Sequence, residues 1–187
     1  MKMATLISSR AVSRLTLTIA LCVLGISPAG AMADRSIVRH TGVSKLDKTF
    51  AIEATHGLMR DAALATLAEH RASTKQVRTF ARKIEDQRSR AHARLRRLAK
   101  ETRLRLPERL DWYQRDQIQK LGSLTGREFD KQFLRYIADT KHTRFYQFEL
   151  NSGAMRVYPP VRTFAEEQLR ILRDDMRQAQ QLLQNYR

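Results

Sequence analysis

The chain has 187 residues, with 35 Lys and Arg against 19 Asp and Glu, so its formal net charge is +16. This length suits one domain, and the strong positive charge favours anionic partners such as lipid head groups, acidic polymers or nucleic acid. The single cysteine, Cys22, excludes a framework of intrachain disulfides.

Residues 1–33 have the pattern of a cleaved bacterial secretory signal. Lys2, Arg10 and Arg14 precede a 12-residue apolar run, and small residues allow cleavage after Ala31 or Ala33. The run is shorter than the roughly 20 residues that a transmembrane helix needs. We therefore expect an exported, periplasmic protein, associated with the cell envelope or free, without a transmembrane helix in the mature chain. Cleavage of the signal would also remove the only cysteine and lower the net charge to +13.

A flexible leader is expected over 34–43, followed by one helical domain over 44–187. Ser44 and Asp47 have capping-box spacing, and Pro107 is expected to follow the end of the second helix. Apolar residues recur at helical spacing and strand-like alternation is absent, so the pattern predicts an all-α four-helix bundle. The expected long helices cover 44–71, 75–104, 127–150 and 161–186, and a short extra helix, 108–121, lies between the second and third.

Each long helix has a charged residue inside its apolar stripe. These residues are Asp61, Arg88 with the adjacent Gln87, Lys141 and Asp175. If the four stripes face one core, two acids and two bases lie at a similar level and their charges sum to zero. An unpaired buried charge costs several kcal/mol, so we predict a cluster of ion pairs. The alternative is that some of these side chains extend to solvent at the helix edges.

The second helix holds most of the positive charge, because residues 75–105 contain 12 Lys or Arg against 3 Asp or Glu. Phe80 is its only aromatic residue, so the base stacking used to bind single-stranded nucleic acid is not favoured. We predict attraction to anionic surfaces or polymers rather than specific nucleic acids; the alternative is a solvated face paired with neighbouring acids. The candidate anion-binding residues are Arg78, Arg82, Arg90, Arg94 and Arg97.

No phosphate-binding glycine loop, serine nucleophile elbow or zinc-protease motif occurs in the chain. Glu53 and His56, like Asp139 and His142, have the i, i+3 spacing of di-iron bundles. Both pairs lie mostly off the apolar stripes, so ordinary surface residues are the expected interpretation. We therefore expect no catalytic residue, cofactor or metal, and a protein that is not an enzyme.

Several local phrases, in this order and spacing, resemble a family of secreted, ferritin-like helical bundles of unknown function, often labelled outer membrane proteins. The most specific phrase is Gly126 followed by Phe129 and Asp130, and the resemblance spans roughly residues 49–184. The other phrases are Leu64-x-x-Leu67-Ala68, Ala72-Ser73, Val77-x-x-Phe80-Ala81, Leu95-x-x-Leu98-Ala99, Leu106-Pro107, Leu121-x-x-Leu124, Phe148-Glu149 and Phe164-Ala165. The resemblance implies a ferritin-like bundle.

In that family the bundle interior has a glutamate, an Asp-His pair and two further histidines, similar to a ferritin metal site. The positions that match are Asp61, Gln87-Arg88, Lys141 and Asp175, so every histidine is absent here. The resemblance therefore implies a divergent form. We expect binding or envelope-stress support through the basic second helix, and the competing hypothesis is a metal-binding, ferritin-like protein with redox or storage activity.

Overall fold

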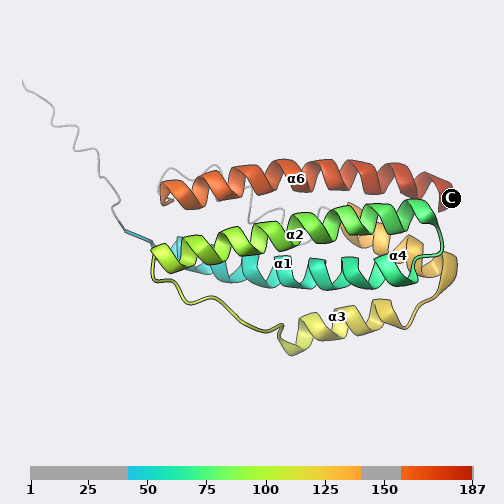
Figure 1. The fold of residues 1–187 in the computed structure, drawn as a ribbon, viewed down its shortest axis with the longest axis horizontal. Coiled ribbons are helices and arrows are strands. Elements are labelled where there is room, and N and C mark those ends of the chain that lie inside the picture. The colour runs from blue at the N-terminus through green and yellow to red at the C-terminus, as the bar shows by residue number, and fades with distance from the viewer. Residues whose placement is uncertain (1–41, 140–156, 187) are drawn as a thin grey trace, which may run out of the picture. The chain divides into compact units, whose positions relative to one another are not determined.

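The computed structural model describes residues 42–139 and 157–186, which hold five α-helices and a closing 3-10 turn (Figure 1). The helices are α1 (Lys45–Arg71), α2 (Lys75–Glu101), α3 (Trp112–Gly122), α4 (Gly126–Ala138) and α6 (Pro159–Leu183), and the turn η1 is Gln184–Tyr186. The all-helical fold with a short extra helix is confirmed. The predicted signal, nearly all of the leader, Lys141, His142 and the later part of the predicted third helix lie outside the described residues.

The predicted capping box at the start of α1 is present. Ser44 Oγ accepts from the Asp47 amide at 3.1 Å, and the Asp47 carboxylate accepts from the Ser44 amide at 2.7 Å. The same carboxylate also accepts from the amide of Tyr158, just before α6, at 3.1 Å. Asp47 is fully buried, so a local helix cap also fixes the start of a helix distant in sequence.

Helix α2 ends at Glu101, whereas the sequence predicted that it would end at Leu104. Arg103 adopts a left-handed conformation, with φ of 55°. The Leu104 amide donates to the Ala99 carbonyl at 2.8 Å, and the Arg103 amide donates to the Lys100 carbonyl at 3.3 Å. This is a Schellman motif, which usually has glycine where Arg103 lies. Because no glycine marks the position, the sequence pattern placed the helix end three residues too late.

Several other boundaries also differ from the prediction. The third helix, expected over 127–150, ends as α4 at Ala138, because Asp139 adopts an extended conformation. The extra helix begins at Trp112 rather than at residue 108, with Asp111 as its cap. Helix α6 begins at Pro159, where a proline at the first turn loses no intrahelical hydrogen bond. At the start of α4, Gly126 has φ of +56°, a conformation that costs other residues roughly 1–2 kcal/mol.

The described core consists of two apolar clusters. Helix α1 packs along α2, α4 packs along α6, and α3 contacts both α1 and α4. One cluster contains Leu64, Phe80, Ile84, Phe129 and Phe133, and the other contains Phe50, Leu58, Leu95, Val161 and Phe164. Along α1, α2 and α6, the two clusters are separated by a short stretch of helix. None of the described helices is long and apolar enough to cross a membrane.

Candidate functional site

Three buried charged residues lie in the stretch between the two apolar clusters. On α1, Asp61 falls between Leu58 and Leu64, which belong to different clusters. On α2, Arg88 falls between Ile84 and Ala91, and on α6 Asp175 falls between Leu169 and Ala179. Each of the three charged residues is at most 1% exposed, so they do not extend to solvent.

Arg88 bridges the two carboxylates. Its Nε donates to Asp61 Oδ2 at 3.3 Å and its Nη2 donates to Asp175 Oδ2 at 2.9 Å. Its Nη1 is buried without a hydrogen-bond partner among the described residues. The structure therefore brings together three of the predicted cluster positions, Asp61, Arg88 and Asp175, whereas Lys141 lies outside the described residues.

Other polar groups complete the surroundings of the two carboxylates. The Tyr136 hydroxyl donates to Asp61 Oδ1 at 2.9 Å, and Lys83 Nζ lies 3.1 Å from Asp175 Oδ1. With its amide nitrogen turned toward Asp175, Gln87 donates to both carboxylate oxygens at 3.1 and 3.0 Å. Burial raises the pKa of the Tyr136 hydroxyl, which keeps it a hydrogen-bond donor at neutral pH. The sequence did not single out Tyr136 or Lys83.

This arrangement suits ion pairing and does not suit a metal ion. The group at the centre is a guanidinium, which is always protonated and has no lone pair to donate to a cation. Among the described residues, no group of three or more His, Cys, Asp or Glu side chains is placed to hold a metal. At these positions, the residues do not fit the ferritin-like site that the family resemblance suggests.

The most specific phrase of the resemblance has a structural explanation. Asp130 on α4 is fully buried, and its carboxylate accepts from the Ser73 amide at 2.8 Å and the Thr74 amide at 3.2 Å. It also accepts from the Tyr186 hydroxyl at 2.7 Å. Asp130 therefore holds the turn before α2 and the end of the described chain, while Gly126 supplies the left-handed turn before it. This phrase specifies the fold rather than a ligand site.

Most of the arginines predicted to bind anions have partners within the protein. Arg82 pairs with Glu69, Arg90 with Asp86, and Arg94 with Glu167. Arg78 donates to the carbonyl of Ala72 at 2.7 Å. Arg97 alone among the five predicted residues has no such partner within the described part of the chain. Three of the five predicted arginines, Arg82, Arg90 and Arg94, are therefore neutralised by carboxylates of the protein itself.

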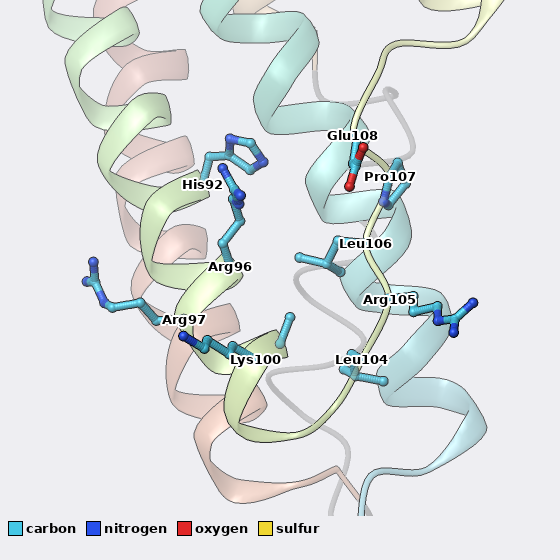
Figure 2. Close-up of a pocket in the computed structure, with 10 residues that line it drawn as sticks. His92, Arg96, Arg97, Lys100, Leu104, Arg105, Leu106, Pro107 and Glu108 are labelled. Atoms are coloured by element: carbon cyan, nitrogen blue, oxygen red, sulfur yellow. The ribbon is translucent and has the colours of Figure 1, made fainter.

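A group of cations without carboxylate partners among the described residues lies toward the C-terminal end of α2, beside a groove of about 1060 Å³ (Figure 2). One wall is α2, with His92, Arg96 and Lys100 at i, i+4 and i+8. The other wall is the segment 104–108 that follows the Schellman motif. Figure 2 shows Leu106 directed into the space between the walls and Arg105 directed away from it.

The groove carries a positive field. Arg96, Arg97 and Lys100 are exposed and form no ion pair with a carboxylate of the described residues. Glu108 is the acidic residue among those that line the groove. Burial, and then the charge of Arg96, lower the pKa of His92 below its usual value near 6.5. The histidine is therefore neutral at pH 7, and a bound anion would favour its protonation.

Arg96 and Lys100 were not among the candidate residues predicted from the sequence, although they share one face of α2 with His92. Their spacing was visible, because residues i, i+4 and i+8 share one helix face. The opposite wall, residues 104–108, could not be predicted, because the helix was expected to continue through Leu104. Acidic partners on other helices, such as Glu69 and Glu167, were equally hidden, because sequence distance does not show which surface charges meet.

The fold and its buried charges define an all-helical bundle whose centre is an ion-pair cluster. The chain belongs to the family described as a domain of unknown function, DUF4142, which matches residues 33–182. It is similar in fold to the crystal structure of a DUF305 fragment from Deinococcus radiodurans, with a TM-score of 0.65 and 14% identity over 77% of this chain and 99% of that chain. No curated protein matches the chain.

Proposed function

We propose that this protein is a non-catalytic, exported binding protein that attaches to anionic components of the cell envelope through the basic end of α2. The ligand chemistry is a phosphate or carboxylate, carried by a lipid head group or an acidic polymer. The observation that carries the proposal is the set of exposed cations Arg96, Arg97 and Lys100 beside a groove, without carboxylate partners among the described residues.

Two further features support the proposal. An arginine guanidinium binds phosphate and carboxylate oxygens at two nitrogens, and Arg96 lies one turn from Lys100 on the same face of α2. Trp112 and Tyr113, which begin α3, are 74% and 52% exposed, and such aromatic rings favour the interface between water and lipid. Export itself rests on the sequence pattern of residues 1–33.

We expect the purified chain without residues 1–33 to bind vesicles of phosphatidylglycerol and phosphatidylcholine, and not vesicles of phosphatidylcholine alone. Each basic residue near an anionic membrane contributes about 1 kcal/mol to the free energy of binding. Replacing Arg96, Arg97 and Lys100 together by glutamine should therefore weaken binding on the order of 100-fold. Binding is measured by co-sedimentation at about 0.1 M salt, where charges more than about 10 Å apart are screened.

The matched control replaces Arg82, Arg90 and Arg94 by glutamine. It removes the same formal charge from the same helix, but from residues that already pair with Glu69, Asp86 and Glu167. The control should bind at least ten times more tightly than the groove variant. Equal losses would show that net charge alone matters and would contradict a site. Competition by soluble polyphosphate or polyglutamate separates polymer binding from lipid binding.

We also expect vesicle binding to strengthen by roughly fivefold as the pH falls from about 7.5 to about 5.5. The pKa of His92 is lowered in the free protein. As the pH falls and the imidazole protonates, the binding surface gains one positive charge that attracts the anionic vesicle. The charged groups that line the same groove are Arg96, Arg97, Lys100, Arg105 and Glu108. None of these side-chain types titrates near neutral pH, whereas histidine does. Replacing His92 by glutamine should leave a flat profile, and an unchanged pH dependence would contradict this role.

A further inference from the structure

The two walls of the groove differ in chemistry. The α2 wall presents His92, Arg96 and Lys100, whereas the opposite wall presents Leu104, Leu106 and Pro107. A site for inorganic phosphate or a hydrophilic polymer would gain nothing from an apolar wall. The groove therefore has features of an amphipathic ligand site rather than of a simple cationic patch.

The apolar wall is held in place by the core. Leu104 and Leu106 are each partly buried and pack against the cluster that contains Phe50, Leu95 and Phe164. Leu104 is also fixed by its amide, which donates to the Ala99 carbonyl at 2.8 Å. Because one side of each leucine contacts the core, the other side is presented to the groove in a defined position.

The cations lie where they can reach a head group while an apolar chain follows the other wall. In Figure 2, His92 and Arg96 are drawn near the Glu108 end of the groove, and Leu104 is drawn toward the opposite end. The volume of about 1060 Å³ slightly exceeds the range of about 300–1,000 Å³ that is usual for small-molecule sites. An acyl chain with one acidic head group matches this charge and hydrophobicity pattern.

We propose that the groove between α2 and residues 104–108 binds one single-chain anionic amphiphile, with its acidic head against Arg96 and its alkyl chain along Leu104, Leu106 and Pro107. This inference rests on the proposed function, because it assigns the ligand class of the same basic site. On this proposal, the ligand of the groove is derived from a lipid and is not a hydrophilic polymer.

The test measures binding of alkyl phosphates by calorimetry below their micelle-forming concentrations. Butyl, octyl and dodecyl phosphate share one head group, and inorganic phosphate has the head group alone. Burial of methylene groups at about 0.8 kcal/mol corresponds to a fourfold gain for each fully buried methylene. In this half-open groove we expect affinity to rise about twofold to fourfold per methylene until the groove is filled.

Two variants locate the alkyl chain. Replacing Leu106 by glutamine should reduce the dependence on chain length while leaving the affinity for inorganic phosphate unchanged. The control replaces Leu46 by glutamine, because Leu46 is 46% exposed on α1 and does not line this groove. Circular dichroism checks that both variants fold, and the chain-length series on the unaltered protein decides the question even if the Leu106 variant does not fold.

The outcomes separate this inference from the proposed function. Equal affinity for dodecyl phosphate and inorganic phosphate would overturn the amphiphile site and leave anion binding intact. Binding to anionic vesicles without binding to any alkyl phosphate would have the same meaning. Absence of binding to vesicles, phosphate and alkyl phosphates would contradict both proposals. Equal binding of dodecyltrimethylammonium and dodecyl phosphate would contradict the role of the cations and overturn the inference.

Discussion

Replacing Arg88 by methionine is expected to lower the free energy of unfolding by about 3–5 kcal/mol, the usual cost of leaving a buried charge without its partner. Methionine keeps much of the length of arginine, so little packing is lost. The loss arises because Asp61 and Asp175, both at most 1% exposed, no longer share a cation between them. Urea denaturation at neutral pH, followed by circular dichroism, measures the change.

A matched control and a double-mutant cycle separate ion pairing from other effects. Replacing Arg90 by methionine removes an exposed pair with Asp86 on the same helix and should change stability by no more than about 0.5 kcal/mol. In a cycle between Asp61 replaced by asparagine and Arg88 replaced by methionine, we expect a coupling of roughly 0.5–3 kcal/mol. A coupling near zero would contradict the cluster.

Replacing Asp130 by alanine is expected to lower the free energy of unfolding by about 3 kcal/mol, because buried hydrogen-bond donors lose their acceptor. The Ser73 amide, the Thr74 amide and the Tyr186 hydroxyl all donate to this buried carboxylate. Leaving a buried donor unsatisfied costs about 1–3 kcal/mol, although loosening of the turn would hydrate some of these groups. Thermal and urea denaturation measure the loss of stability. The rate of amide hydrogen exchange should increase most at the start of α2.

Two other substitutions calibrate the effect of Asp130. Tyr186 replaced by phenylalanine removes one donor and should cost about 1 kcal/mol. Asp116 replaced by alanine removes an exposed acid that pairs with Lys120 at i, i+4, so it should change stability by no more than about 0.5 kcal/mol. If the Asp130 variant were as stable as the Asp116 variant, the capping role would be wrong.

The helices were predictable because their apolar residues recur with the helical period over long stretches. The capping box at Ser44 was predictable for a similar reason, since both of its partners lie within four residues. The same period places Asp61, Arg88 and Asp175 inside the apolar stripes of their helices, at a similar height along the bundle. The end of α2 was not predictable, because Arg103 occupies a left-handed position that a sequence pattern assigns to glycine.

The candidate site was harder to predict than the fold. Each helix reveals which of its own residues share a face, so the row formed by His92, Arg96 and Lys100 was accessible. Which arginines are neutralised depends on acids from other elements, as with Arg94 and Glu167. The function of Asp130 likewise depends on Ser73, which is 57 residues away. Such contacts are set by tertiary packing, and one sequence does not encode them in a local pattern.

The division of the core by Arg88 has a consequence for how the helices are aligned. Apolar residues on α2 recur every three or four residues, so a slip of one turn, about 5.4 Å, would again place apolar residues against apolar residues. The same slip would move the guanidinium into one of the two apolar clusters, away from both carboxylates. We infer that the buried charges select one sliding position of α2 against α1 and α6 among several that hydrophobic contacts alone would accept.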